Sequence, residues 1–260
     1  MKNTLSQQYI LANTHPFYHT VAVADSVSST NDVVKAMAPH RRQGYVLVAD
    51  SQQAGKGRNG KTFYSPAGKG LYLSVLLKPQ MDFSNALLVT AAAAVAAAQA
   101  IEATADVSCG IKWVNDIYIN NRKIAGILAE TALQPGSSQL DYMVLGIGIN
   151  THTAPFPPEL ENMASAVRDF ATPPDRNALA CRFLNRFYDY YSNLEAGKFM
   201  DYYRAKSILM GKNISVYHNN TAYTATVTGI DDMGRLVVRT SSSTETVLSS
   251  GEITVREAAL

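Results

Sequence analysis

The 260-residue sequence is poor in the features that mark metal-binding, secreted and nucleic-acid-binding proteins. Its two cysteines, Cys109 and Cys181, lie far apart and form no metal-type spacing. The formal net charge is only +2, which is too small to indicate nucleic-acid binding as the main function. No basic segment followed by an apolar run occupies residues 1–20, so a secretory signal is not indicated. We therefore expect a soluble, cytoplasmic protein without a nucleic-acid partner.

The sequence also lacks a strongly apolar run long enough to cross a membrane. Its one long uncharged stretch, residues 83–99, is mostly alanine, which is only weakly apolar. That stretch falls short of the ~20 strongly apolar residues that a spanning helix needs. We predict instead a buried helix packed on a sheet, with Ser84 as its N-cap, and no membrane partner.

What the sequence does contain is a basic, glycine-rich stretch between two expected strands. The aliphatic runs at residues 45–49 and 71–77 are bounded by glycine and proline, a pattern typical of strands. Between them, a glycine-rich backbone can turn its N–H groups toward an anion while lysine and arginine add positive charge. We predict a loop that closes over a phosphate-bearing ligand. The alternative is a disordered basic surface loop.

Two known phosphate-binding patterns match this loop in letters but not in context. Gly55, Gly57 and Gly60 have the G-x-G-x-x-G spacing, and residues 55–62 fit G-x-x-x-x-G-K-[ST]. Both motifs require a helix directly after the loop, with its N-terminus facing the phosphate. Pro66 and two glycines precede the next strand, so no helix can start there. A P-loop nucleotidase is therefore the weaker alternative.

Polar residues follow the first expected strand, residues 20–24. Ser29 and Asp32 have the spacing of a helix capping box, and we favour that interpretation. In the functional alternative, Ser29, Thr30 and Asn31 offer polar groups to a ligand at the strand end.

A second polar group lies in a predicted strand at residues 108–119, which contains Lys112, Asn115 and Asp116. Charged groups are rarely buried without partners, so this pattern is unusual. A turn at residues 120–122 brings Lys123 back close to Asp116. The alternative is an ordinary hairpin with a surface lysine.

The next strand, residues 140–149, carries Gly146 and Gly148 at alternate positions, as if something lies flat against the sheet. After two helices, the pattern changes at Gly211 to short strands and tight turns. That change predicts a small C-terminal β-barrel.

Five segments in one order resemble biotin protein ligases. They are SSTN at 28–31, QQAGKGRNG at 52–60, KWVND at 112–116, KIAGILAE at 123–130 and GIGIN at 146–150. The resemblance covers most of residues 25–150, and the terminal barrel agrees with the family's SH3-like domain. It implies an α+β fold, in which a mixed β-sheet with helices on one side forms a class II synthetase-like catalytic domain. We place that domain at residues 1–208 and the SH3-like domain at 209–260.

The resemblance implies a two-step ligation. Biotin and Mg-ATP give biotinoyl-5′-adenylate and pyrophosphate, and a lysine of a biotin carboxyl carrier domain then attacks to give an amide and AMP. The nearest alternative is a lipoate or octanoate ligase or transferase of the same fold. Some biotin ligases also repress transcription through an N-terminal DNA-binding domain. Because the first strand is expected near residue 20, we predict a short form without that domain. The sequence leaves open whether the chain forms a homodimer.

The resemblance also implies roles for individual residues. Lys123 corresponds to the main catalytic side chain, and the other catalytic candidates are Arg58 and Lys56. The biotin-binding candidates are Ser29, Thr30, Asn31, Gln52, Gly57, Arg58, Lys123, Gly126 and Gly148. The nucleotide-binding candidates are Phe63, Lys112, Asn115, Asp116, Asn150 and Arg256. Asp116 is also the candidate ligand for Mg²⁺, although the sequence does not fix the metal site.

Two positions depart from the family pattern. Lys56 stands where arginine is usual, and lysine lacks the bidentate fork of a guanidinium, so its phosphate role is in doubt. Val114 stands where proline is usual, which removes no functional group.

Overall fold

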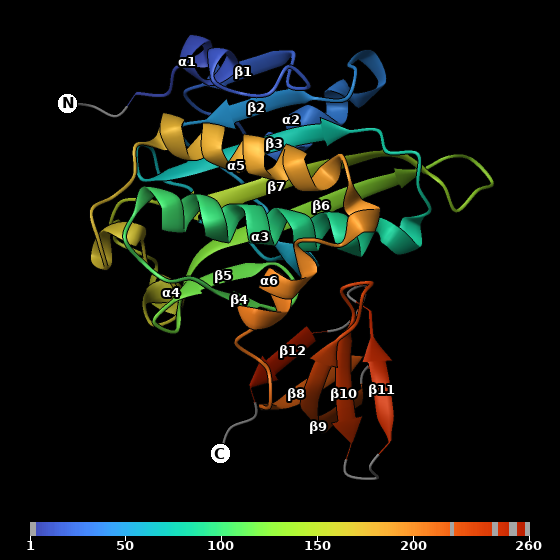
Figure 1. Ribbon diagram of the computed structural model, residues 1–260. Helices are drawn as coiled ribbons and strands as arrows, with labels where there is room; N and C mark the ends of the chain where they lie inside the picture. The colour runs from blue at the N-terminus through green and yellow to red at the C-terminus, as the bar shows by residue number, and fades with distance from the viewer. Residues whose placement is uncertain (1–3, 219–220, 241–243, 250–253, 258–260) are drawn as a thin grey trace.

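The structure is a computed structural model that describes residues 4–218, 221–240, 244–249 and 254–257. Its centre is a seven-stranded mixed sheet with the strand order β1-β2-β3-β7-β6-β5-β4 (Figure 1). Only β1 and β2 pair in parallel, and the other neighbours are antiparallel. The strands are β1 Thr20–Ala24, β2 Tyr45–Ala49, β3 Gly70–Leu77, β4 Gly110–Lys112, β5 Asp116–Ile119, β6 Arg122–Leu133 and β7 Leu140–Asn150.

Two long helices cover one face of this sheet. The alanine-rich α3 (Ala86–Thr104) packs beside α5 (Arg176–Tyr191) across that face (Figure 1). The segment Phe83–Thr104 is long and apolar enough to cross a membrane, yet 67% of its most apolar window is buried inside the protein. Small alanine side chains let the helix approach the sheet closely, and the predicted buried helix is confirmed.

The predicted N-cap at Ser84 is wrong. Ser84 lies inside a short 3₁₀ turn, Phe83–Asn85, that precedes α3. Asp82 caps this turn, since its Oδ1 accepts a hydrogen bond of 2.9 Å from the backbone N–H of Ser84. The carboxylate therefore takes the capping role two residues earlier than expected.

A shorter helix, α2 (Thr30–Met37), packs on the opposite face of the sheet. Its Val34 lies in a small apolar cluster with Leu47 of β2, Leu76 of β3 and Val144 of β7. The long helices thus share one face as predicted, and α2 is the exception. The remaining helical segments are α1 Gln7–Ala12, α4 Pro158–Glu161, α6 Met200–Ala205, η1 Ala38–His40, η2 Arg58–Gly60, η4 Val167–Asp169 and η5 Leu194–Ala196.

The C-terminal part forms a separate five-stranded antiparallel sheet with the order β11-β10-β9-β8-β12 (Figure 1). Its last strand returns to pair with its first, as in a small barrel. The predicted fold class, a mixed α+β domain followed by an SH3-like barrel, is confirmed. The strands are β8 Asn213–His218, β9 Thr221–Ile230, β10 Leu236–Thr240, β11 Glu245–Leu248 and β12 Thr254–Glu257.

The single strand predicted over residues 108–119 is wrong. β4 ends at Lys112 and β5 begins at Asp116, and the two strands form a hairpin in which these residues are partners. The turn between them contains a cis peptide bond between Trp113 and Val114. Tryptophan and valine favour strands, so the local sequence hides this turn. Buried contacts fix it instead, because the Tyr203 hydroxyl donates a hydrogen bond of 2.9 Å to the Val114 carbonyl.

Candidate active site

A cavity of about 600 Å³ opens on the face of the sheet that carries α2. Strands β6 and β7 form its floor, and its walls come from the start of α2, the 52–63 loop, the β4–β5 turn and residues 160–164. Every predicted site residue lines this cavity except Asn150 and Arg256. Four chain segments that are distant in sequence therefore meet at one place.

The two exceptions lie elsewhere. Asn150 is buried at the end of β7, where its Nδ2 donates a hydrogen bond of 3.1 Å to the Ser165 carbonyl. Arg256 belongs to β12, but its side chain lies outside the described part of the chain. The nucleotide-binding roles of both residues stay predictions.

The first turn of α2 forms one polar wall of the cavity. Thr30 donates to Gln52 Oε1 from both its backbone N–H (2.8 Å) and its hydroxyl (3.0 Å). Gln52 in turn donates from Nε2 to the Ser65 hydroxyl at 2.9 Å. Ser29 is the N-cap residue, but its side chain makes no capping hydrogen bond. The capping box that we favoured for Ser29 and Asp32 is therefore wrong, and the alternative, a polar strand end beside a cavity, is what forms.

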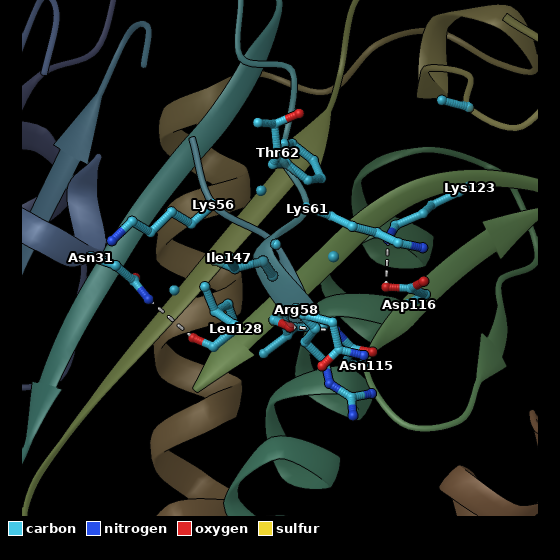
Figure 2. A pocket seen from close by; sticks show the side chains of 18 of the residues that line it. Asn31, Lys56, Arg58, Lys61, Thr62, Asn115, Asp116, Lys123, Leu128 and Ile147 are labelled. Carbon is cyan, nitrogen blue, oxygen red and sulfur yellow. Dashed lines mark hydrogen bonds and ion pairs between the residues drawn. The ribbon is translucent and has the colours of Figure 1, made fainter. Parts of the chain in front are cut away.

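Asn31 is buried and held from two sides. Its Nδ2 donates to Glu130 Oε2 at 2.8 Å, and its Oδ1 accepts a hydrogen bond of 2.6 Å from the Ser74 hydroxyl. Figure 2 shows a further, longer hydrogen bond of 3.4 Å from the same Nδ2 to the Leu128 carbonyl. A Cβ atom at Gly146 would come within 2.1 Å of the same Oδ1. Asn31 therefore requires glycine at position 146. Sequence reasoning missed Ser74, although a lone hydroxyl inside the apolar run of β3 was a usable signal.

The ring of Phe63 lies against the other alternate glycine of β7, Gly148. A Cβ atom at Gly148 would lie 2.4 Å from its ring, and one at Gly126 would lie 3.4 Å from it. The chain's own Asn31 and Phe63 thus lie against the alternate glycines that predicted a flat contact. The prediction that Phe63 covers an adenine stays a prediction.

Positive charge gathers at the centre of the cavity. Lys123 Nζ lies 2.7 Å from Asp116 Oδ1, as the hairpin pattern predicted. Arg58 extends from the loop past Asn115, and Lys61 extends toward Lys123 in the same view (Figure 2). Burial lowers the pKa of Arg58 from its usual value, while the Asp116 carboxylate opposes that shift. A partly desolvated guanidinium with two ammonium groups beside it suits an anionic ligand.

The cavity has an additional wall that the sequence did not indicate. Leu160 lines it from α4, and Met163 and Ala164 line it from the segment directly after that helix. This segment is tied to β6 because the Lys123 backbone N–H donates to the Met163 carbonyl at 2.8 Å. Met163 is 58% exposed, which makes an open apolar surface beside the cationic centre. Gly146, which the alternate-glycine pattern had pointed to, also lines the cavity. The other lining residues that sequence reasoning missed are Asn59, Lys61, Thr62, Trp113, Tyr118, Ile127, Leu128 and Ile147.

Comparisons with known proteins agree with this arrangement. The Biotin/lipoate A/B protein ligase family matches residues 23–150, and the Biotin protein ligase C terminal domain matches residues 210–256. The Bifunctional ligase/repressor BirA of Bacillus subtilis is 32% identical over 246 residues, which are 91% of this chain and 73% of that protein. The Biotin--[acetyl-CoA-carboxylase] ligase of Mycobacterium tuberculosis is 30% identical over 241 residues, 89% of this chain and 86% of that protein.

The fold also matches a solved structure closely. The biotin protein ligase from Aquifex aeolicus in complex with biotin and ATP has a TM-score of 0.81 at 25% sequence identity. The match covers 92% of this chain and 99% of that chain.

Proposed function

This chain belongs to the Biotin/lipoate A/B protein ligase family, and from that premise we propose that it uses ATP to join biotin to a lysine of a carrier protein. The observation that carries the proposal is the cavity, in which a compartment of buried polar groups adjoins a cationic centre. Two of the proteins named above, from Mycobacterium tuberculosis and Aquifex aeolicus, are biotin ligases by name, and this chain covers 86% and 99% of their lengths. The C-terminal domain match extends the likeness through both parts of this chain.

The first step joins a carboxylate to a phosphate. A carboxylate oxygen of biotin attacks the α-phosphorus of ATP, pyrophosphate leaves, and a mixed anhydride, biotinoyl-5′-adenylate, is formed. Two negatively charged groups must approach each other for this attack, so cations near them lower the barrier. Lys123, Arg58 and Lys61 are the cavity residues that supply this charge. The ion pair with Asp116 supports a fixed position for the Lys123 ammonium.

The second step transfers the acyl group. The ε-amine of the acceptor lysine attacks the acyl carbon, AMP leaves with the bonding electrons, and the nitrogen loses a proton as the amide forms. A mixed anhydride hydrolyses in water, so the cavity must stay covered until the acceptor arrives. We assign this cover to the 52–63 loop, which carries both Arg58 and Phe63 into the cavity. Biotin carboxyl carrier domains are the acceptors we propose, and the cytoplasm is the proposed location.

Magnesium is part of the proposal. Among the described lining residues, Asp116 is the only carboxylate, and no described group of three or more His, Cys, Asp or Glu could hold a metal. Mg²⁺ commonly keeps several waters and binds through one or two carboxylates plus substrate phosphates. A single carboxylate therefore fits a metal that arrives on the triphosphate. Asp116, with Asn115 beside it, would hold the ion, which would neutralise phosphate charge.

Lipoate is a competing acid because the family description includes its ligases, and octanoate is the other acid of the alternative expected from the sequence. The compartment at the start of α2 is lined by buried polar residues, namely Ser29, Thr30 and Asn31. A dithiolane ring or an alkyl chain offers them no hydrogen-bonding partner, whereas the biotin ureido group offers N–H and C=O groups. Thr30 and Asn31 already have partners in Gln52, Ser74 and Glu130, so the compartment is a fixed polar surface. The ureido group can add hydrogen bonds to that surface and an apolar ring or chain cannot, so the compartment favours biotin.

The test is pyrophosphate release with ATP and Mg²⁺ and with biotin, lipoate or octanoate as the acid. Release that depends on biotin supports the proposal. Release with lipoate or octanoate alone would keep the adenylation chemistry and overturn the substrate. ATP hydrolysis that needs no acid would overturn the ligase assignment.

A further inference from the structure

The cationic end of the cavity is connected to the C-terminal barrel through one buried side chain. Trp113 lines the cavity from the β4–β5 turn, and it is 6% exposed. Its indole Nε1 donates a hydrogen bond of 3.0 Å to the carbonyl of Gly234. Gly234 lies in the turn between β9 and β10 of the barrel, 121 residues away in sequence.

This barrel turn, residues 231–234, has a fixed shape. Asp231 Oδ1 accepts hydrogen bonds from the backbone N–H groups of Met233 (3.0 Å) and Arg235 (2.9 Å). Gly234 has a φ of +75°, a conformation that side chains disfavour. A Cβ atom added at Gly234 would lie 3.6 Å from the Cγ of Leu87 on α3. The turn is therefore seated against α3 and presents the Gly234 carbonyl in one direction.

On its other side, Trp113 belongs to the turn that carries the functional groups. Asn115 follows two residues later, and its Nδ2 donates a hydrogen bond of 2.6 Å to the Ile127 carbonyl on β6. Asp116 comes next and forms the ion pair with Lys123. A shift of the Trp113 ring would therefore move the backbone that sets these groups.

We propose that the barrel turn 231–234 positions the phosphate-binding end of the active site through Trp113. The Gly234 carbonyl fixes the indole, the indole fixes the β4–β5 turn, and the turn places Asn115 and Asp116. This role rests on the proposed function, because the ligand at that end is the nucleotide. Trp113 and Asp231 are positioning residues in this scheme. The biotin compartment at Thr30 and Asn31 has no part in it.

The experiment is a double-mutant cycle with W113F and D231A. W113F removes the indole N–H and keeps an aromatic ring, and D231A removes the acceptor that shapes the turn. Each single variant is expected to raise the KM for ATP about tenfold, as the loss of one buried hydrogen bond allows, with the KM for biotin nearly unchanged. Because both act on the same contact, the double variant should be no worse than W113F alone. The control is D232A, which removes a neighbouring carboxylate that is 97% exposed and that pairs with Arg204 instead of shaping the turn.

Tryptophan fluorescence gives a second readout. Trp113 is the only tryptophan in the sequence, so emission from the ligand-free protein reports on this indole alone. D231A should shift the emission to longer wavelength, while D232A should leave it unchanged. D231N, which keeps an acceptor oxygen, should restore both the emission and the KM for ATP. If D231A cannot be recovered folded, D231S, with a weaker acceptor, replaces it.

A D231A protein that melts earlier but keeps wild-type emission and the wild-type KM for ATP would overturn the positioning role. Additive effects in the double variant would also overturn it. Failure of the proposed function has a different signature, which is the absence of biotin-dependent pyrophosphate release in the wild-type protein. The emission comparison is made without ligand, so it still tests the contact in that case.

Discussion

Lys56 forms an ion pair with Asp32, with 2.5 Å between Nζ and Oδ1. The contact ties the glycine-rich loop to the first turn of α2, at the edge of the cavity that Lys56 helps to line. The hydrogen bond with Asp32 raises the pKa of Lys56 from its usual value. Lys56 stands where the family resemblance implied a phosphate-binding arginine, and its ammonium is engaged at the loop edge. We interpret it as a residue that helps to hold the loop closed.

Removing this ion pair should let biotinoyl-adenylate escape faster. Both side chains are well exposed, so the pair contributes only about 0.2–1 kcal/mol, and K56M or D32N should increase escape about two- to fivefold. The adenylate released into solution is measured after a single turnover without acceptor.

Added salt and a swap of the two charges test whether loss of the Lys56–Asp32 ion pair causes the faster escape of adenylate. Added salt should speed escape from the wild-type protein and have little effect on K56M, because salt screens exposed pairs. The swapped pair K56D/D32K should recover slow escape. K35M, which alters an α2 lysine paired instead with Glu130, is the matched control. Equal escape from K56M and the wild type at low salt would contradict the loop-closing interpretation.

Lys123→Ala should remove most adenylate formation while the fold persists. The ammonium is the cation that the Asp116 carboxylate holds in the cavity, and preorganised charge of this kind commonly contributes about 10²–10³-fold. Biotin-dependent pyrophosphate release measures the loss, and thermal unfolding checks the fold. Wild-type release from this variant would remove Lys123 from the catalytic assignment.

The Lys123–Asp116 pair shows which parts of the site were predictable. Asp116 begins β5 and Lys123 lies near the start of β6, the next strand of the same hairpin, so a hairpin pattern alone places them near each other. The Lys56–Asp32 pair depends instead on how the loop folds back onto α2, which no local pattern encodes. The same holds for the β4–β5 turn, where tertiary hydrogen bonds from Tyr203 and to Gly234 override the strand preference of the local residues.

The overall fold shows the same difference between features that local sequence patterns predict and features that tertiary contacts decide. Runs of β-branched residues predicted the strands, and the alanine-rich stretch predicted a buried helix. The segment with Leu160 and Met163 was not predictable as a cavity wall, because its place depends on backbone hydrogen bonds with β6. Sequence patterns thus predict well where helices and strands lie along the chain. They predict poorly how a loop packs against those helices and strands.

Arg58→Gly should loosen the loop and reduce selectivity for the carrier domain. Arg58 carries a partly desolvated guanidinium into the cavity, where Asp116 favours its charge. Without it, adenylate should leave at least about tenfold faster, as the loss of a charge-assisted contact allows, and should acylate unrelated lysines. Mass spectrometry of a mixture of carrier domain and unrelated protein measures the scatter. R58K, which keeps the charge without the fork, should be intermediate. Unchanged selectivity in R58G would count against a closing role for the loop.

The two glycines of β7 should respond differently to alanine, although both face the cavity. In G146A the new Cβ would come within 2.1 Å of Asn31 Oδ1. Asn31 is 3% exposed and held by Ser74 and Glu130, so it has little room to move. The displaced amide would enter the compartment that we assign to the biotin ring. G146A should therefore weaken biotin binding by about tenfold or more, with a smaller effect on ATP binding.

In G148A the Cβ would meet the ring of Phe63 at 2.4 Å instead. Phe63 belongs to a loop, and its ring can shift as that loop adjusts, so the effect on biotin binding should be smaller than in G146A. G229A on β9 is the control, because its Cβ finds only ordinary contacts with Val237 at 3.8 Å. Isothermal titration with biotin alone measures all three variants. Equal biotin affinity in G146A and G229A would show that Asn31 moves freely, and the compartment would then not be the rigid polar wall that favours biotin over lipoate.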